Sequence, residues 1–347
     1  MSTSLTSSTK KTTSNKNKPL PWLIWALLGA FLVLIFLSII FGSSSVSLKE
    51  LIEAIKGEND TAALIVTYIR IPRVIASIAV GAALGCSGLI LQSMLNNSLA
   101  SPGIIGINSG AGLVVVVVSL IFPGSLIARA IGAFIGAFFT SIMIYGIAKL
   151  SGAARGTIIL AGVAISGLFS ALTNTIIELY PSTILNRASF SVGSLKNITL
   201  DQLKIAVPLI IIGLIAAFLI ASSLSVLSLG DDVASSLGLN VKATRFISLL
   251  ISALLASAAV AIGGLLSFLG LIAPHIVRKL IGVSNYKRLV LHTMIFGADI
   301  TLLCDLLARV LFKPYELPVG IFLAVIGVPF FLFLLFSRGR RDRLDTN

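Results

Sequence analysis

Long apolar runs follow one another along almost the whole chain, with short polar segments between them. A hydrocarbon core of about 30 Å takes roughly 20 residues of α-helix, so each run of that length is a candidate membrane span. The span at about 266–281 is the least distinct, because it is short and merges with the span before it. Ten spans are predicted, at about residues 22–41, 74–95, 104–121, 126–148, 157–179, 202–222, 245–265, 266–281, 289–310 and 318–336. The pattern therefore predicts an all-α, polytopic membrane protein with ten transmembrane helices.

The two ends of the chain differ from this apolar body. Residues 1–19 are rich in Ser, Thr and Lys and carry almost nothing apolar, which is typical of a disordered tail. The run that follows is too long for the apolar region of a signal peptide, so we predict an uncleaved first helix. The predicted organisation is a tail at 1–19, a ten-helix transmembrane domain at 20–337, and a basic tail at 338–347.

Composition excludes several classes of function. The chain is 56% hydrophobic and 11% charged, whereas a soluble domain carries about 25% charged residues. The sequence contains no HExxH, GxSxG, Cys/His cluster or GxxxxGK[ST] phosphate loop, so no catalytic set and no ATP site of that type is visible. The two cysteines, Cys86 and Cys304, both lie inside apolar runs, so neither a metal site nor a disulfide is expected.

The net charge of +13 has a membrane explanation. Nucleic-acid binding would need a basic stripe interleaved with aromatic residues, and the basic residues here are scattered between apolar runs. With ten spans, 16 of the 26 Lys and Arg residues fall on one side and ten on the other. Cytoplasmic loops are enriched in Lys and Arg, so both termini are predicted to be cytoplasmic.

A few ionisable residues lie inside or at the ends of predicted spans, where burial of a charge is costly. Asp305 and Arg309 are four residues apart and can pair on one helix face. Asp299 lies nearer mid-membrane without an obvious partner. Arg70 and Arg73 flank Pro72 at the outer start of the second span, which suits either an acidic partner or interaction with lipid headgroups.

The segment around 223–244 is too polar to span a membrane and lies on the predicted cytoplasmic side. It contains the run SLGDDVASSLGLNVKATR. It contains helix-forming stretches broken by Gly230 and Gly238. Two interpretations remain open from this pattern: a contact for a soluble partner, or a solvated connector.

Several separated motifs resemble one known family. They are RIPRVIASIAVGAALGCSGLILQSMLNNSLASPGIIGINSGAG at 70–112, LAGVAIS at 160–166, the DDVASSLGLNV loop, FLGLIAPHIVRKLIG at 268–282, CDLLAR at 304–309 and ELPVGIFLAVIGVPFFLFLL at 316–335. In order and spacing they resemble the FecCD-type permeases, the membrane subunits of bacterial ABC importers for iron-siderophores, haem and vitamin B12. The resemblance covers about residues 50–337.

The resemblance implies a transport subunit rather than an enzyme. It implies a dimer of permease subunits, identical or related, two cytosolic ATPase subunits that hold ATP and Mg, and an extracellular or periplasmic substrate-binding protein. No cofactor on this chain and no nucleic-acid partner are implied, and the expected location is the bacterial cell membrane. An iron-siderophore complex is the favoured cargo, with haem or cobalamin as alternatives within the family. An ion-coupled secondary transporter is the alternative from a different class, and only Asp299 could serve it.

By the same resemblance, three groups of residues match functional positions. Docking of the binding protein is implied for Arg70, Arg73 and Arg309. Coupling to the ATPase is implied for Gly230, Asp231, Ala234, Ser236, Leu237 and Gly238. Candidates for the inner gate are Asn97, Leu99, Arg155, Gly156 and Thr157. The gate regions depart from the usual family pattern, since Ser98 stands where many members have Pro.

Overall fold

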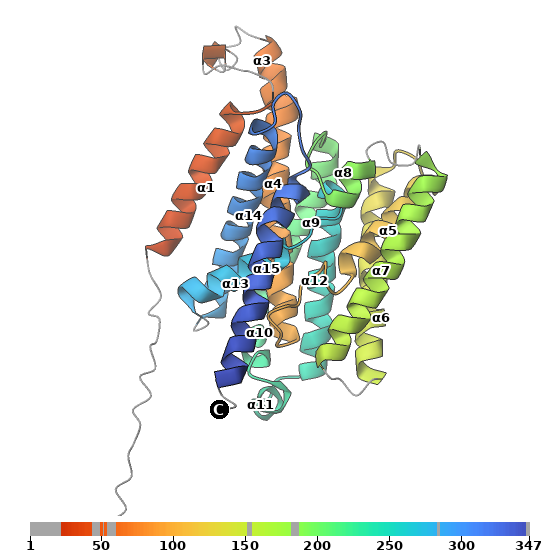
Figure 1. Cartoon of the computed structure of the whole chain (residues 1–347), viewed down its shortest axis with the longest axis vertical. Coiled ribbons are helices and arrows are strands. Elements are labelled where there is room, and N and C mark those ends of the chain that lie inside the picture. The colour runs from red at the N-terminus through yellow and green to blue at the C-terminus, as the bar shows by residue number, and fades with distance from the viewer. Residues whose placement is uncertain are drawn as a thin grey trace, which may run out of the picture.

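The computed structural model describes residues 22–43, 49–50, 52–53, 60–150, 155–181, 187–282 and 285–344. Regular structure in these residues is entirely helical, and the helices form one bundle (Figure 1). Their bounds are α1 Leu23–Ile40, α3 Asp60–Ile65, η1 Val66–Arg70, α4 Ile71–Met94, α5 Ile107–Ile121, α6 Leu126–Leu150, α7 Arg155–Leu179, α8 Arg187–Val192, α9 Leu200–Leu219, α10 Ala221–Leu227, α11 Asp231–Ser236, α12 Val241–Gly263, α13 Leu269–Ile281, α14 Tyr286–Val310 and α15 Val319–Leu344. Residues 1–19 lie outside the described residues, and α15 continues through most of the predicted tail at 338–347.

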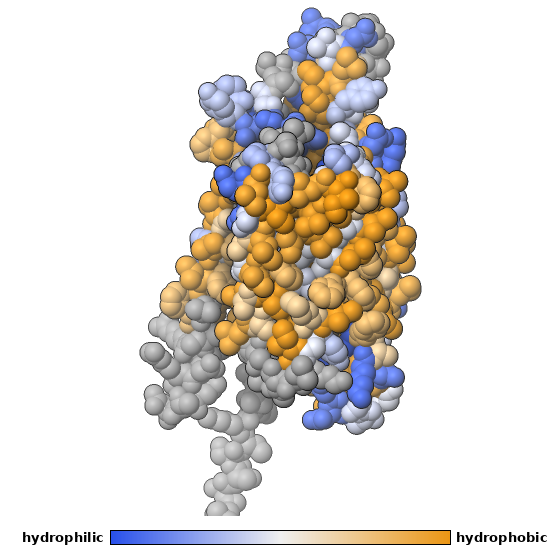
Figure 2. All heavy atoms as spheres, turned by 90° about the vertical axis from the view of Figure 1, so that its right-hand side faces the viewer, coloured by the Kyte–Doolittle hydropathy of each residue, from blue (hydrophilic) through white to orange (hydrophobic). Residues whose placement is uncertain are grey.

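Each of the ten predicted spans coincides with a helix, namely α1, α4, α5, α6, α7, α9, α12, α13, α14 and α15. Within the described residues, seven helices are long and apolar enough to cross a membrane, and α5 and the apolar part of α15 are somewhat shorter. Apolar side chains form a broad band between two polar ends of the molecule (Figure 2). The chain is thus a multi-pass membrane protein.

The predicted span at 266–281 is shorter than a full membrane helix. α13 has 13 residues, which is about 20 Å of helix and less than the thickness of a hydrocarbon core. Non-helical backbone at 264–268 precedes α13, with Gly264 and Leu266 buried and Ser267 exposed. Its polar groups find partners in the protein: Leu265 N donates to Phe190 O at 2.9 Å, and Asn108 Nδ2 donates to Leu266 O at 2.9 Å. Irregular backbone is tolerated in a membrane protein under this condition.

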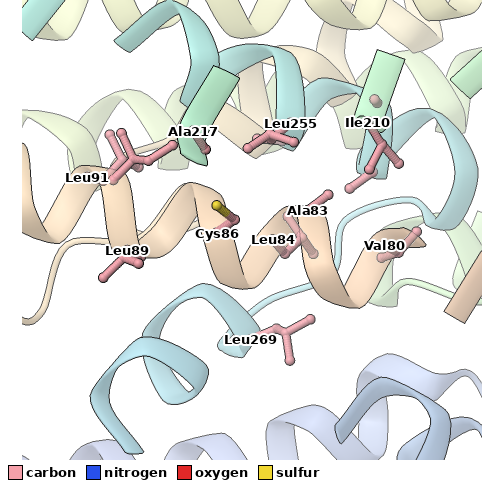
Figure 3. Close-up of a cluster of buried hydrophobic side chains, with 14 of the residues drawn as sticks. Val80, Ala83, Leu84, Cys86, Leu89, Leu91, Ile210, Ala217, Leu255 and Leu269 are labelled. Carbon is pink, nitrogen blue, oxygen red and sulfur yellow. The ribbon is translucent and has the colours of Figure 1, made fainter. Parts of the chain in front are cut away.

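Helix α4 lies at the centre of the bundle and is buried on nearly all sides. It packs against α9, α12, α13 and α14. Figure 3 shows this core, with Leu84, Cys86 and Leu89 of α4 facing Leu255 of α12 and Leu269 of α13. A helix that is apolar all round is typical of a protein core or of a membrane span, and α4 lies inside the bundle.

Glycines allow the neighbours of α4 to approach its backbone. A Cβ atom on Gly88 would lie 1.8 Å from the carbonyl oxygen of Gly270, and one on Gly81 would lie 2.4 Å from that of Gly297. Small residues at helix crossings permit the close van der Waals packing that holds membrane helices together. The GxxxG pair Gly132 and Gly136 of α6 also contacts a helix of the same chain, α5.

The helix from Asp60 to Met94 is continuous through α3, η1 and α4 and has 35 residues, so it is about 52 Å long and exceeds the thickness of a hydrocarbon core. Its first part stands above the other helices (Figure 1). We call this the outer end of the bundle, following the predicted orientation. Helix α11 and the end of α15 lie at the opposite, inner end (Figure 1).

Candidate functional site

At the outer end, Arg73 of α4 is the centre of a buried ion-pair network. Its Nε donates to Asp305 Oδ1 at 2.8 Å and its Nη1 donates to Glu316 Oε2 at 2.9 Å. Asp305 also pairs with Arg309 Nε at 3.0 Å, as its position four residues earlier on α14 predicts. The side chain of Ser43, just after α1, donates to the other carboxylate oxygen of Glu316. The network therefore links α4, α14, the loop before α15 and the end of α1.

Two of the arginines in this region satisfy the last carbonyl groups of α1. Arg309 Nη1 donates to Ser38 O at 3.1 Å and to Phe41 O at 3.3 Å. Arg70 Nη1 donates to the carbonyl oxygens of Ile39 and Ile40. The last carbonyls of a helix have no partner within it and carry the negative end of its dipole, so cations are favourable there. The arginines thus fix the outer end of α1 to α14 and η1.

Glu316 lies in the loop between α14 and α15, and its surroundings affect its pKa in opposite directions. Burial alone raises the pKa of its carboxyl. The charge of Arg73, hydrogen bonds from Ser43 and Arg73, and the charge of Lys196 lower this pKa, and together they outweigh the effect of burial. The net effect is a pKa below the ordinary value of 4.5. Glu316 is therefore a carboxylate at neutral pH and completes the charge balance of the network.

All three residues that match docking positions of the family are buried in this chain. Arg70, Arg73 and Arg309 have exposed fractions of 2%, 4% and 2%. Their guanidinium groups bond to carboxylates and carbonyls of the same chain, so a docked protein would reach them only if the network opened. Their docking role stays a prediction, whereas their structural role in joining α1, α4 and α14 is visible in the contacts.

At the inner end, the segment that matches the coupling loop forms the short helix α11. Gly230 precedes it with φ +109°, and Gly238 follows it with φ +80°, both backbone conformations that favour glycine. Leu239 N donates to Ala234 O and Gly238 N donates to Ser235 O, which is the Schellman pattern of a helix end. Asp231 pairs with Arg245 of α12 at 2.7 Å. These contacts attach α11 to the long helix α12.

One row of exposed side chains, along α11 and at its two ends, is apolar although it lies outside the band of membrane helices. Leu229, Val233 and Leu237 are spaced four residues apart and have exposed fractions of 60%, 44% and 64%. Ala234, on the opposite side, is fully buried. A row of exposed apolar side chains on a polar end of a protein is typical of an interaction site.

The inner-gate candidates fall partly outside the described side chains. The side-chain oxygen of Asn97 accepts a hydrogen bond from Leu99 N at 2.9 Å, so the two residues form one turn between α4 and α5. Arg155, Gly156 and Thr157 begin α7, and their side chains lie outside the described residues. A gating role for these residues stays a prediction.

Helix α7 has an unusual exposed face for a membrane helix. Small and polar residues at Ala164, Gly167, Ala171, Asn174 and Glu178 are exposed along one stripe. A helix face that contacts lipid carries large apolar side chains, and the flank of α7 with exposed leucines does so, at Leu168, Leu172 and Leu179. The stripe is therefore suited to contact with water or with another protein. On its other flank lie bonded hydroxyl groups, with Ser109 Oγ and Ser166 Oγ 2.7 Å apart.

Sequence reasoning missed several of these features. Glu316 was not singled out because its partners, Arg73 and Ser43, are 243 and 273 residues away. The stripe on α7 could have been found from its small and polar residues, which recur at helical spacing. Asp299 is buried, and neither of its carboxylate oxygens has a hydrogen-bond partner in the structure, in agreement with the absence of a partner in the sequence.

The profile of the FecCD transport family matches residues 30–337. The chain belongs to the FecCD transport family. It is 34% identical to the Fe(3+)-citrate import system permease protein YfmE of Bacillus subtilis (strain 168) over 96% of this chain and 100% of that protein. It is 36% identical to the hemin transport system permease protein HmuU of Yersinia pestis over 91% of this chain and 97% of that protein.

Among solved structures, the chain is similar to one described as an inward-facing conformation of a metal-chelate type ABC transporter. The TM-score is 0.78, the sequence identity is 27%, and the match covers 91% of this chain and 99% of the other. The fold and family expected from the motifs are confirmed. The chain is thus a membrane-embedded permease of the type found in ABC importers, a transport subunit rather than an enzyme.

Proposed function

We propose that this FecCD-family chain, with a second permease subunit, forms the pathway through which a ferric chelate crosses the bacterial cell membrane. The chelate is delivered by an extracellular substrate-binding protein, and a pair of cytosolic ATPases drives the transport. The observation that carries the proposal is the match along almost the whole chain to permeases named for Fe(3+)-citrate and hemin import. An iron-siderophore complex is the favoured cargo.

The proposed orientation places both termini in the cytoplasm. Basic residues gather at the inner end of the bundle, at Lys242, Arg245, Arg278, Lys279 and Lys287. Lys and Arg are enriched in cytoplasmic loops, which supports this orientation. It places α11 on the cytoplasmic side, where an ATPase can reach it.

The exposed apolar row of α11 is the proposed contact with the ATPase. Leu229, Val233 and Leu237 would enter a groove of the partner, and their desolvation would stabilise the complex. Because α11 is joined to α12 by the Arg245–Asp231 pair, movement of α11 would be passed to a helix that packs against α4. Alternation between inward-open and outward-open states would then be a rigid-body movement of packed helices.

The stripe on α7 is the proposed lining of the pathway. Its small side chains leave room for a bulky solute, and Asn174 together with the nearby serine hydroxyls offers hydrogen bonds. Glu178 is the one acidic residue of the stripe. Weak, distributed contacts suit a solute that is passed on rather than held tightly. The chain itself would contribute one wall, and a second permease subunit would contribute the other.

A paired substitution on α11 tests the proposal. Leu237→Asp places a charge in the apolar row, whereas Ser235→Asp places the same charge in the same turn of the helix on the other side. With the ATPase and the binding protein reconstituted in proteoliposomes, Leu237→Asp is expected to reduce ATP-dependent uptake of a ferric siderophore at least tenfold. Ser235→Asp is expected to leave it within about twofold. Equal uptake by both variants would exclude α11 as the coupling contact.

Competition between cargoes tests the chelate. Uptake of iron-loaded siderophore into the same proteoliposomes would be measured with excess ferric citrate, haemin or cobalamin. Uptake of haemin or cobalamin, with no uptake of any ferric siderophore, would overturn the favoured cargo and leave the importer proposal intact.

A further inference from the structure

Four cations lie where α13 ends and α14 begins, in the inner half of the bundle. Two belong to the last turn of α13 and two to the first turn of α14, and we call them the basic cluster: Arg278, Lys279, Lys287 and Arg288. The sequence contains no Asp or Glu between Asp232 and Asp299. No member of the cluster forms an ion pair with a carboxylate of the described residues. The positive charge of the cluster is therefore not balanced within the part of the chain that the structure describes.

Arg278 is the least exposed member of the basic cluster and lies between three helices. Its Nη2 donates to Ser93 Oγ of α4 at 3.0 Å, and Ser93 Oγ lies 3.4 Å from Tyr286 OH of α14. Its Nε is buried and has no hydrogen-bond partner among the described residues. A buried cation is costly unless acceptors or a counter-charge satisfy it. The guanidinium therefore retains donor capacity that no group in the described part of the chain uses.

The helix ends beside the cluster supply only part of the compensation. The C-terminal end of α13 carries about half an elementary negative charge, which is favourable for Arg278 and Lys279. The N-terminal end of α14 carries a partial positive charge, so Lys287 and Arg288 lie in an unfavourable position relative to its dipole. Four cations and one positive helix end together create a positive potential that attracts anions.

Exposed apolar side chains of membrane helices lie next to the cluster. Lys287 Nζ lies 5.8 Å from the ring centroid of Phe218, which is near the end of α9. Phe218 and Leu219 are both exposed, Leu219 to 73%. Leu291, one turn after Lys287 on α14, is exposed as well. Cations beside exposed apolar side chains of membrane helices are typical of the boundary between lipid headgroups and acyl chains.

The position of α13 favours lipid over the ATPase as the source of the anion. Helix α13 lies at the side of the bundle, whereas α11, the proposed contact with the ATPase, lies below it (Figure 1). A phospholipid in the leaflet at the inner end reaches the side of the bundle. Phosphate suits the donors that are present, because a guanidinium group binds it through two parallel N–H groups, and ammonium and hydroxyl groups add further hydrogen bonds.

We propose that the basic cluster, with the hydroxyl groups of Ser93 and Tyr286, binds the phosphate group of an anionic phospholipid in the leaflet at the inner end. Basic pockets between membrane helices are a recurrent type of site for such headgroups. Ser93 lies in the last turn of α4, and the turn formed by Asn97 and Leu99 follows it. The bound lipid thus holds the inner end of α4, next to the candidate gate, against α13 and α14. The inference requires only that the chain is a membrane protein and does not depend on the cargo.

The experiment measures lipid binding to the purified permease in detergent by native mass spectrometry, with phosphatidylglycerol as the anionic probe and phosphatidylcholine as the zwitterionic one. Arg278→Gln removes the central guanidinium, and the double variant Lys279→Gln/Arg288→Gln removes two exposed cations. We expect the affinity for phosphatidylglycerol to fall about fivefold in Arg278→Gln and at least tenfold in the double variant, with phosphatidylcholine binding unchanged. The control Lys242→Gln removes an exposed cation at the start of α12, also at the inner end, and should change the affinity less than twofold.

Thermal unfolding separates a bound lipid from a purely structural role of Arg278. Phosphatidylglycerol should raise the melting temperature of the wild type, because a ligand that binds only the folded state stabilises it, and should raise that of the variants much less. An equal rise in all proteins would overturn the inference and leave Arg278 as a support for the ends of α4 and α13. The double variant keeps the test valid if Arg278→Gln is itself unstable, since both of its replaced side chains are exposed.

Two further measurements test the source of the anion. Inorganic phosphate at the same concentration should protect the wild type far less than phosphatidylglycerol does, and equal protection would overturn the assignment to lipid. Association of the ATPase with the permease should be unchanged in the double variant. Loss of that association, with phosphatidylglycerol binding at the wild-type affinity, would assign the cations to the protein partner instead.

Discussion

Removal of the Arg73 guanidinium tests the role of the outer network. The variant Arg73→Met keeps much of the side-chain volume and removes two charge-assisted hydrogen bonds, to Asp305 at 2.8 Å and to Glu316 at 2.9 Å. Asp305 is fully buried and would retain only Arg309 as an ionic partner. Breaking a buried ion pair by removing one partner costs about 3–5 kcal/mol, because an uncompensated charge remains.

The loss is measurable as thermal unfolding of the purified permease in detergent. A destabilisation of this size corresponds to a fall in melting temperature of roughly 6–20 °C, at about 2–4 °C per kcal/mol for a large domain. Asp305→Leu alone should be destabilising for the same reason. The double variant Arg73→Met/Asp305→Leu should lose less than the sum of the two, since both members of the pair are replaced by apolar groups.

The control is Lys204→Met, which removes an exposed cation whose pair with Asp201 lies in water. Its melting temperature should match that of the wild type, because exposed pairs contribute little. The reasoning would be refuted if Arg73→Met melted like the wild type and failed to bind the substrate-binding protein. That result would assign Arg73 to docking, as the family resemblance implies.

Three further predictions concern other parts of the chain. The carboxyl of Glu316 has a lowered pKa in the folded protein, so the stability it contributes is present above its ordinary pKa of 4.5 and is lost as the pH falls through the lowered value. Thermal unfolding between pH 7 and pH 3 should therefore show a loss of stability in acid that is smaller in Glu316→Gln than in the wild type. Identical pH profiles of the two proteins would contradict this. Gly88→Ala should destabilise the permease by about 1–3 kcal/mol, because the new Cβ would lie 1.8 Å from Gly270 O. The control Gly29→Ala, which has open space around it, should not destabilise the permease. Equal melting temperatures of the two variants would be inconsistent with the close crossing of α4 and α13. Asp299→Asn should leave ATP-dependent uptake into proteoliposomes within about twofold, and so should collapse of the proton gradient in the wild type; uptake abolished by each of the two changes would instead favour ion-coupled transport.

Hydrophobic periodicity was sufficient to predict where the membrane helices lie, because a span is a local property of about 20 residues. It could not predict that α13 is a half-helix. Composition is equally apolar across the break at 264–268, and the partners that satisfy the broken backbone, Phe190 and Asn108, come from distant segments. The pair of Asp305 and Arg309 was predictable because it follows helical spacing.

The burial of the outer arginines was not predictable from the chain alone. Their position near the outer side suggests exposed cations, but the compensating groups are a carboxylate 243 residues from Arg73 and the backbone carbonyls at the end of α1. Backbone carbonyls carry no sequence signal, so their capacity to accept hydrogen bonds from Arg70 and Arg309 emerges only when α1 ends beside α14. The exposed stripe on α7 lay within a run that is otherwise typical of a membrane helix.

The central claim is that this permease is a passive conduit driven by separate ATPases at the end that carries α11. The most direct measurement is uptake of radiolabelled ferric siderophore into proteoliposomes that contain the permease, with and without its ATPase and binding-protein partners. The account predicts accumulation against a gradient only with all components and with ATP on the α11 side. Accumulation by the permease alone, driven by an imposed proton gradient, would contradict it.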